Sequence, residues 1–316
     1  MTHGSEDRPD LRPLADPSGI VCGLAFDHRD SLHVLLRDLG LGLTHDEVAA
    51  LKEVVVRAVA PLASAVMLDD DYGRWAIERG AVPPSVGLIM PLEAQGYAQP
   101  GDERLTTLLP GFSPELARVR GAVACKLLLP FRADRPSLVD HQLAVAGDAV
   151  AVTRAAGLAI VLEPQVYRLS TESPAMFAAR VLSLTLAATE QLAAIGADLL
   201  KLPFPVLDTP GAPEGPDADA RARDACSALS RATGGTRWVL YGAGVDTKTF
   251  AWQLRHAGAA GASGFLVGRT IWRDALSDDL QHAAATATRV CAPRFAEFAA
   301  LAQEICRPLS SATTIA

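Results

Sequence analysis

Eight short runs of apolar residues alternate with longer amphipathic stretches along most of the chain. The apolar runs are rich in Val, Ile and Leu and are bounded by turn-forming residues, a pattern typical of strands buried on both faces. They cover residues 20–26, 63–68, 86–90, 122–129, 158–162, 197–202, 238–241 and 264–267.

The stretches between these runs have helical spacing, and their ends carry helix-terminating signals. Thr44, followed three residues later by Glu47, predicts a capping box for a helix over 45–59. Further helices are predicted over 137–156, 173–194, 217–232 and 246–257, each ending close to a glycine. A short helix is predicted after Ser113, and a terminal helical layer over 278–306.

Strands that alternate with helices eight times predict parallel pairing with right-handed crossovers. A single-domain α/β fold, the closed (β/α)8 TIM barrel, accounts for residues 19–306. Residues 1–18 are expected to form a flexible or loosely docked arm, and 307–316 a tail. The rival fold is an open doubly wound sheet, but Asp27-His28-Arg29 follows the first run where that fold needs a glycine-rich loop.

The composition narrows the class of protein. The chain of 316 residues is 49% hydrophobic and carries a net charge of −7, which argues against nucleic acid or an anionic membrane as the main partner. No apolar run approaches the ~20 residues that span a bilayer, and the polar first residues do not resemble a signal peptide. Five scattered cysteines without a CxxC pair indicate reduced thiols, so we expect a cytoplasmic protein.

Two lysines lie inside apolar runs, Lys126 in ACKLLL and Lys201 in DLLKLPF. Burial of an unpaired ammonium is costly, so such a lysine needs a reason. One reason is catalysis, since an amine must be neutral to attack a carbonyl, and both desolvation and a neighbouring cation favour the neutral form. The alternative is a structural lysine paired with a buried carboxylate.

Two carboxylates lie at the ends of predicted strands. Glu163 closes the run LAIVLEP between the two lysine-bearing strands in strand order, where a carboxyl group suits proton transfer. Asp27 ends the first strand and could bind a sugar hydroxyl or hold a lysine. A plain Lys–Glu pair and an ordinary loop cap are the structural alternatives for these two residues.

The last two strands end in features of a phosphate site. Gly242-Ala243-Gly244 follows the seventh run and Gly268-Arg269 the eighth, so that backbone N–H groups and a guanidinium could bind one anion. A tight turn with an ion-paired arginine is the alternative. The run Asp69-Asp70-Asp71 suggests a metal, but no histidine or second carboxylate motif completes a divalent site, so an ordinary acidic loop is favoured.

Eight segments together resemble class I, Schiff-base-forming aldolases of the tagatose 1,6-bisphosphate aldolase type, a group that also contains sulfofructose phosphate aldolases. The resemblance covers about residues 20–305. The matching segments are LAFDHRDSL, VMLDDDYG, EAQGY, CKLLLPFRAD, VLEPQVY, ADLLKLPFPV, YGAGVDTKTF and GFLVGRTIWRDAL.

The resemblance implies a metal-independent, cofactor-free lyase that cleaves a ketose phosphate to dihydroxyacetone phosphate and an aldehyde. Lys201 would form the Schiff base, Lys126 would tune the site, and Glu163 would be the acid/base. Substrate would be bound by Asp27, His28, Arg29, Gly242, Ala243, Gly244 and Arg269. The partner would be a small sugar phosphate or sulfosugar phosphate, and family members often form homo-oligomers.

Three residues depart from the pattern of that family. His28 replaces the usual Gln, Gly242 a common Ser, and Pro203 an acidic residue often found after the lysine. They leave the lysine chemistry intact but leave the sugar and its distal group open, and the pair Glu163-Pro164 is more similar to the sulfofructose phosphate members. A barrel that only binds a sugar phosphate, and aldol chemistry of the deoxyribose-phosphate type, remain alternatives.

Overall fold

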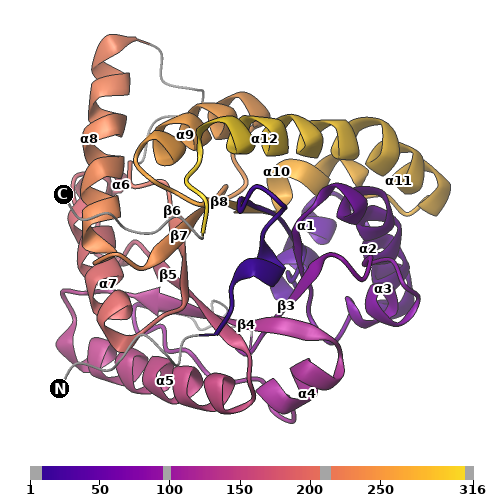
Figure 1. Ribbon diagram of the computed structural model, residues 1–316, viewed down its shortest axis with the longest axis horizontal. Coiled ribbons are helices and arrows are strands. Elements are labelled where there is room, and N and C mark those ends of the chain that lie inside the picture. The colour runs from indigo at the N-terminus through magenta and orange to yellow at the C-terminus, as the bar shows by residue number, and fades with distance from the viewer. Residues whose placement is uncertain (1–8, 95–100, 207–214, 310–316) are drawn as a thin grey trace.

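Eight parallel strands close into a barrel in which the last strand pairs with the first (Figure 1). The computed structural model describes residues 9–94, 101–206 and 215–309. The predicted (β/α)8 barrel is confirmed, and the open sheet is excluded. The strands follow one another in chain order and span Val21–Ala25 (β1), Ala65–Met67 (β2), Gly87–Pro91 (β3), Ala122–Phe131 (β4), Ala159–Val166 (β5), Leu199–Pro203 (β6), Arg237–Tyr241 (β7) and Gly264–Val267 (β8).

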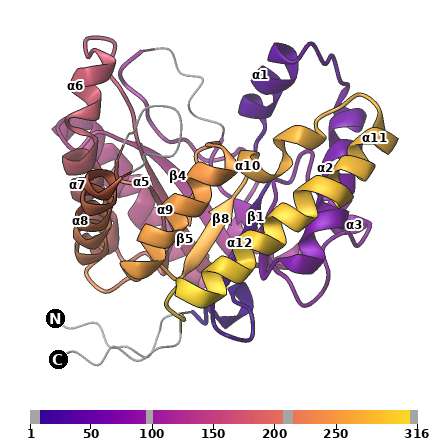
Figure 2. The same ribbon diagram turned by 90° about the horizontal axis from the view of Figure 1, so that it is seen from above.

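Helices surround the barrel as an outer ring (Figure 1). Figure 2 shows that α1 and α6 project at the same end of the barrel, the end to which the strands lead. None of the described helices is long and apolar enough to cross a membrane. The helices span Asp30–Asp38 (α1), His45–Val59 (α2), Arg74–Glu78 (α3), Pro114–Val119 (α4), Pro136–Ala155 (α5), Pro174–Ala178 (α6), Val181–Ile195 (α7), Pro216–Ala232 (α8), Thr247–Ala259 (α9), Arg269–Trp272 (α10), Leu280–Thr286 (α11) and Ala292–Ile305 (α12).

The strands are buried on both faces, as their continuous apolar runs predict. Their outward side chains join those of the helices in one large core. Their inward side chains form a second, smaller apolar cluster inside the barrel. That inner cluster consists of Leu14, Val21, Ala25, Ala65, Met67, Ile89, Ala124, Ala159, Val161, Leu199, Val239 and Leu266.

The N-terminal segment closes the bottom of the barrel. The indigo segment lies across the middle of the ring in Figure 1, and its short 3-10 helix Arg12–Leu14 presents Leu14, which is 1% exposed, to the inner cluster. A side chain at position 87 would meet the carbonyl oxygen of Pro13 at 2.3 Å, so glycine is needed for this contact. Residues 1–8 of the expected arm lie outside the described residues.

The helix ends show where local sequence decides structure and where it does not. The Thr44–Glu47 capping box of α2 is present as predicted. The single helix predicted over 173–194 is wrong, because a turn at residues 179–180 divides it into α6 and α7. At that turn the guanidinium of Arg180 bonds to Glu172 and Asp134. Because these contacts hold Arg180 outside a continuous helix, the helix breaks here although the local spacing of apolar residues favours it.

Candidate active site

On four strands, the inward-facing residue that comes next after the inner apolar cluster has an ionisable side chain. Side chains alternate between the two faces of a strand, so every second residue of each strand points into the barrel. At the end where the strands lead into their helices, this alternation replaces an apolar residue by a charged one. The successive inward pairs are Ala25 and Asp27, Ala124 and Lys126, Val161 and Glu163, and Leu199 and Lys201.

Lys201 lies in the mouth of the barrel beside a carboxylate. Its Nζ donates to Oε2 of Glu163 at 2.8 Å and lies 5.6 Å from the centre of the Tyr241 ring. The side chain is 6% exposed and lines a cavity of about 580 Å³. The amine is therefore buried enough to lose most of its water, yet open to a ligand in the cavity.

Lys126 is surrounded by carboxylates. Its Nζ donates to Oδ2 of Asp27 at 2.8 Å and to Oε1 of Glu93 at 2.6 Å, and lies 3.4 Å from Oε2 of Glu163. Burial alone would raise the pKa of Asp27, but the ammonium groups of Lys126 and Lys201 outweigh it and hold that pKa well below its ordinary value. Glu163 thus bridges the two lysines, while Lys126 is held in an ion-pair cluster.

Sequence reasoning assigned no role to Glu93. Its Oε2 also accepts a hydrogen bond from the backbone N–H of Leu128, and burial raises the pKa of its carboxyl although Lys126 opposes that shift. Glu93 continues the inward phase of Ile89 in β3, so strand periodicity could have found it.

Lys52 of α2 is a second residue without a predicted role. It is fully buried and pairs with Asp69, and its Nζ also donates to the carbonyl oxygens of Phe26 at 2.9 Å and His28 at 2.8 Å. These bonds fix the backbone on both sides of Asp27. The sequence feature that could have identified Lys52 is its place among the apolar residues of the helix predicted over 45–59.

Arg29 lies apart from the cavity that contains Lys201. It is 7% exposed and donates to the backbone carbonyl of Glu93 at 2.6 Å. It is not among the residues that line the cavity. The structure therefore brings Arg29 to the backbone that carries Glu93, and its predicted contact with substrate is not among the contacts that this cavity offers.

The residues predicted to bind phosphate come together at the rim of the same cavity. Gly242, Ala243, Gly244 and Arg269 all line it, and Nη2 of Arg269 donates to the carbonyl oxygen of Ala243 at 2.9 Å. Ala243 and Gly244 have φ values of 48° and 85°, so two successive residues adopt left-handed backbone conformations. The turn is closed by a hydrogen bond of 3.0 Å from the Val245 N–H to the carbonyl oxygen of Gly242, and backbone N–H groups in turns can bind anions.

Two of the departures from the family pattern meet near this rim. A side chain at position 242 would approach Val267, Phe250 and Thr270 at 3.0 to 3.1 Å, so the glycine allows close packing beneath the turn. His28 lines the cavity, with Nδ1 3.7 Å from Oδ1 of Asp27. Burial, assisted by the charges of Arg269 and Lys201, lowers the pKa of His28 to about 3, so its ring is neutral at pH 7.

The acidic run after β2 is bound within the protein. Asp69 pairs with Lys52 and accepts hydrogen bonds from the backbone N–H groups of Asp71 and Tyr72, while Asp70 pairs with Arg120. Within the described ranges, no group of three or more His, Cys, Asp or Glu side chains is placed to hold a metal ion. Pro203, the third departure, ends β6 and lines the cavity.

Comparison with solved structures supports the fold. The chain superposes on a fructose-bisphosphate aldolase from Plasmodium falciparum with a TM-score of 0.69 at 14% identity, covering 94% of this chain and 93% of the other. A fructose-bisphosphate aldolase from Slackia heliotrinireducens gives a TM-score of 0.63 at 21% identity, covering 90% and 86%. At these identities the likeness concerns the fold alone.

Comparison with curated sequences finds relatives over most of the chain. A tagatose 1,6-diphosphate aldolase of Listeria monocytogenes is 28% identical over 280 residues, 84% of this chain and 81% of that protein. Tagatose 1,6-diphosphate aldolase 1 of Streptococcus mutans is 27% identical over 301 residues, 91% of each. A stretch of 129 residues is 33% identical to tagatose 1,6-diphosphate aldolase 2 of Enterococcus faecalis, but spans only 38% of that relative.

The family model described as DeoC/LacD family aldolase matches residues 23–274, which include every strand from within β1 to β8 and all the ionisable residues of the barrel mouth. The chain belongs to the DeoC/LacD family of aldolases, which are lyases.

Proposed function

We propose that this protein is a class I aldolase that cleaves a ketose phosphate through a Schiff base on Lys201. The observation that carries the proposal is the 2.8 Å contact between Lys201 Nζ and Glu163 in a cavity that is also lined by the glycine turn 242–244 and Arg269. An amine, an acid/base group and an anion site in one cavity are the parts that imine chemistry on a phosphorylated ketone requires.

In the first stage, Lys201 loses a proton to Glu163 and attacks the C2 carbonyl of the substrate. Glu163 returns protons as the carbinolamine loses water, leaving a protonated imine. The positive imine nitrogen accepts the electron pair of the C3–C4 bond as that bond breaks, while the C4 hydroxyl gives its proton to the ionised Glu163 and the aldehyde departs. Glu163 then delivers that proton to C3 of the enamine, and hydrolysis of the imine by water releases dihydroxyacetone phosphate and restores Lys201.

Lys126 supports this chemistry without forming a bond to substrate. Its ammonium lies 3.4 Å from the carboxylate oxygen of Glu163 that also binds Lys201. A fixed positive charge at that distance stabilises the ionised carboxylate when Glu163 holds no proton. Asp27 and Glu93 hold Lys126 in place. Asp27 is not among the residues that line the cavity, so its predicted contact with substrate hydroxyls would need the substrate to reach past Glu163.

The phosphate of the ketone half binds at the rim, where Arg269 and the N–H groups of the turn 242–244 would surround it. This contact orients C2 toward Lys201, so that the amine and the carbonyl carbon are held in the geometry that the reaction requires.

The names of the relatives favour a tagatose 1,6-bisphosphate-like substrate. A sulfofructose phosphate is the second candidate, on the strength of the Glu163-Pro164 pair. We further propose a cytoplasmic enzyme that needs no cofactor, has no nucleic-acid or membrane partner and assembles as a homo-oligomer.

Borohydride reduction in the presence of dihydroxyacetone phosphate tests the proposal. The chain has four lysines, and a reduced adduct is expected on Lys201 alone. Peptide mass mapping locates it, with the exposed Lys248 of α9 as the internal control. An adduct absent from Lys201, or a loss of activity with EDTA that a divalent metal restores, would refute the Schiff-base assignment. Binding of the ketone phosphate without any turnover would instead favour the non-catalytic barrel.

A further inference from the structure

Beyond Lys201 the cavity is walled by apolar side chains. Phe177 and Val181 come from α6 and α7, Phe204 and Val206 follow β6, and Trp252 comes from α9. We call these five residues the apolar wall. The rings of Phe204 and Trp252 are in contact, with centroids 5.2 Å apart. The indole N–H of Trp252 donates to Asp219 at 2.8 Å, so the polar edge of this ring is already satisfied within the protein.

The topology places most of this wall to one side of the phosphate-binding rim. Around the barrel the order is β5, β6, β7, β8, and Arg269 follows β8 whereas four wall residues follow β5 or β6. Lys201 lies on β6, the strand that leads to Phe204 and Val206 of the wall, and β6 is the direct neighbour of β7, which leads into the rim. A substrate with its phosphate at Arg269 and C2 at Lys201 therefore continues toward the wall with its remaining carbons.

The charges of the cavity match a single phosphate. Among the described residues that line it, Lys201 and Arg269 are the only lysine and arginine, and both already have roles. His28 is neutral at pH 7, since its pKa is lowered to about 3. The acidic side chains of Glu163 and Asp246 also line the cavity. The two internal segments outside the described residues, 95–100 and 207–214, contain neither lysine nor arginine.

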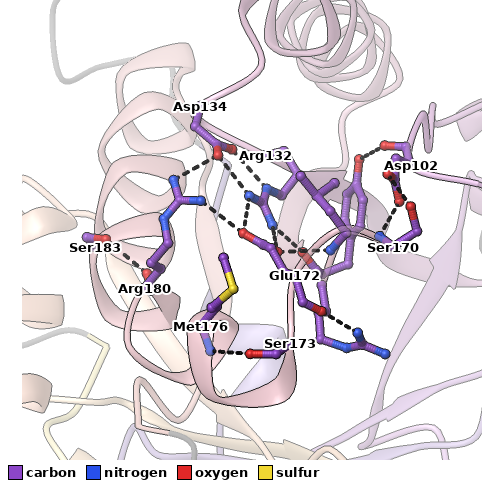
Figure 3. Close-up of polar contacts among 12 residues, drawn as sticks. Asp102, Arg132, Asp134, Ser170, Glu172, Ser173, Met176, Arg180 and Ser183 are labelled. Carbon is purple, nitrogen blue, oxygen red and sulfur yellow. Dashed lines mark hydrogen bonds and ion pairs between the residues drawn. The ribbon is translucent and has the colours of Figure 1, made fainter.

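Two arginines close to α6, Arg132 and Arg180, are engaged in another cluster, shown in Figure 3. The guanidinium of Arg132 forms two bonds to Glu172, at 2.7 and 2.9 Å, and also binds Asp134. Arg180 spans Glu172 at 2.9 Å and Asp134 at 2.8 Å. Because Glu172 precedes α6 and Arg180 follows it, this ion-pair cluster fixes both ends of the segment that carries Phe177.

We propose that the aldehyde half of the substrate is uncharged and packs against the apolar wall, so that the enzyme takes a ketose monophosphate, with its phosphate on the ketone half, in preference to a bisphosphate. This inference rests on the proposed Schiff-base aldolase function. It replaces the two substrates named there, each of which carries a second anionic group, by a monophosphate. A second phosphate at the wall would lose its water without gaining a cation in return. The uncharged lining residues Gln165, Gln253 and Thr249 offer partners for hydroxyl groups instead.

The direct test compares kcat/KM for ketose 1-phosphates and the corresponding 1,6-bisphosphates, with dihydroxyacetone phosphate measured as the common product. We expect the monophosphate to be favoured at least tenfold. In the synthetic direction, glyceraldehyde and butanal should be better acceptors for dihydroxyacetone phosphate than glyceraldehyde 3-phosphate. A bisphosphate cleaved as well as the monophosphate, or better, overturns the inference.

A pair of variants on one short helix sharpens the test. Phe177→Arg introduces a cation into the wall and is expected to shift the kcat/KM ratio at least tenfold toward the bisphosphate. Met176→Arg adds the same charge at a neighbouring position that is 55% exposed and outside the cavity, and should leave the ratio within about twofold. Equal shifts in the two variants would mean that the wall does not contact the substrate, and would contradict the inference.

Borohydride trapping separates this inference from the proposed function, because dihydroxyacetone phosphate lacks the aldehyde half. Trapping on Lys201 together with a preference for bisphosphates rejects the apolar-wall inference alone. Failure of trapping rejects both.

Discussion

The lower and upper halves of the barrel interior are built on the same strands but differ in chemistry. The lower half is an apolar cluster sealed by Leu14. The upper half holds two lysines and three carboxylates, each no more than 6% exposed. Asp27, Glu93, Lys126, Glu163 and Lys201 form the charged layer.

The difference shows that the inward-facing positions, which recur at every second residue of a strand, serve two purposes: stability in the lower half and chemistry in the upper half. Apolar side chains in the lower layer stabilise the fold by about 25 cal/mol for each Å² of surface removed from water. The charged layer contributes little net stability, since desolvation of buried ions offsets their mutual attraction. The lower layer should thus determine whether the barrel folds, and the charged layer what it does. The predictions that follow run from the largest expected effect to the smallest.

Lys201→Met should reduce kcat by about 10⁴-fold or more, because no other group can supply the covalent electron sink. The barrel should still fold, since Glu163 keeps Lys126 at 3.4 Å as an ionic partner. Steady-state kinetics with thermal unfolding checks both points, and Lys248→Met serves as the control. Substantial activity in Lys201→Met would show that the charged layer does not act through this lysine.

Glu163→Gln should reduce kcat by about 10² to 10⁴-fold, the range for loss of a general acid/base. The amide keeps the size of the side chain but cannot exchange protons with Lys201. KM should change much less than kcat. A variant that lost only affinity would show that Glu163 binds substrate without transferring protons.

Leu199→Ala should lower the free energy of unfolding by about 2 to 5 kcal/mol, because it leaves a cavity in the lower layer. Leu199 is fully buried, two residues before Lys201 on the same strand. Chemical denaturation measures the loss, and the folded fraction should still form the imine. Leu280→Ala on α11, where the side chain is 37% exposed, is the control and should change stability little.

Arg269→Ala should raise KM for a ketose phosphate about 10- to 100-fold through loss of a charge-assisted contact, with a smaller effect on kcat. Arg273→Ala is the matched control, because Arg273 lies one helical turn away and does not line the cavity. An unchanged KM in Arg269→Ala would contradict the placement of the phosphate.

The smallest effect is expected at acid pH, from the ion-pair cluster outside the barrel. Hydrogen bonds from Arg132 lower the pKa of Glu172 to about 2 from an ordinary 4.5. A carboxyl with a lowered pKa stabilises the fold fully above its unfolded pKa, and that stabilisation is lost as pH falls from about 4.5 to about 2. Glu172→Gln should therefore show a shallower loss of stability over this interval than the wild type, measured by thermal unfolding at each pH. Identical slopes would show that other carboxyls dominate acid unfolding.

The sequence was sufficient for the barrel and for most of the charged layer. Strands buried on both faces give continuous apolar runs, so a lysine at position 126 or 201 stands out against its neighbours. The same signal was weaker for Glu93, which lies two residues beyond the last residue of β3, and for Lys52, which sits on a helix.

Other features depend on contacts between distant segments and could not be predicted from local patterns. The break between α6 and α7 follows from the bonds of Arg180 to Glu172 and Asp134. The side chain of Arg29 donates to the carbonyl of Glu93, which lies 64 residues further along the chain, and does not line the cavity. The apolar wall combines residues from three helices and one strand end, so no single segment of sequence contains it.

The pairing of β1 with β8 also has a consequence for synthesis on the ribosome. Val21 N–H bonds to Ser263 and Leu309 N–H to Gly19, so the first strand acquires its second neighbour only when nearly the whole chain has been translated. Until then the nascent polypeptide exposes two sheet edges to other chains. Prematurely terminated products that end before residue 264 are therefore expected to aggregate or to be removed by proteases.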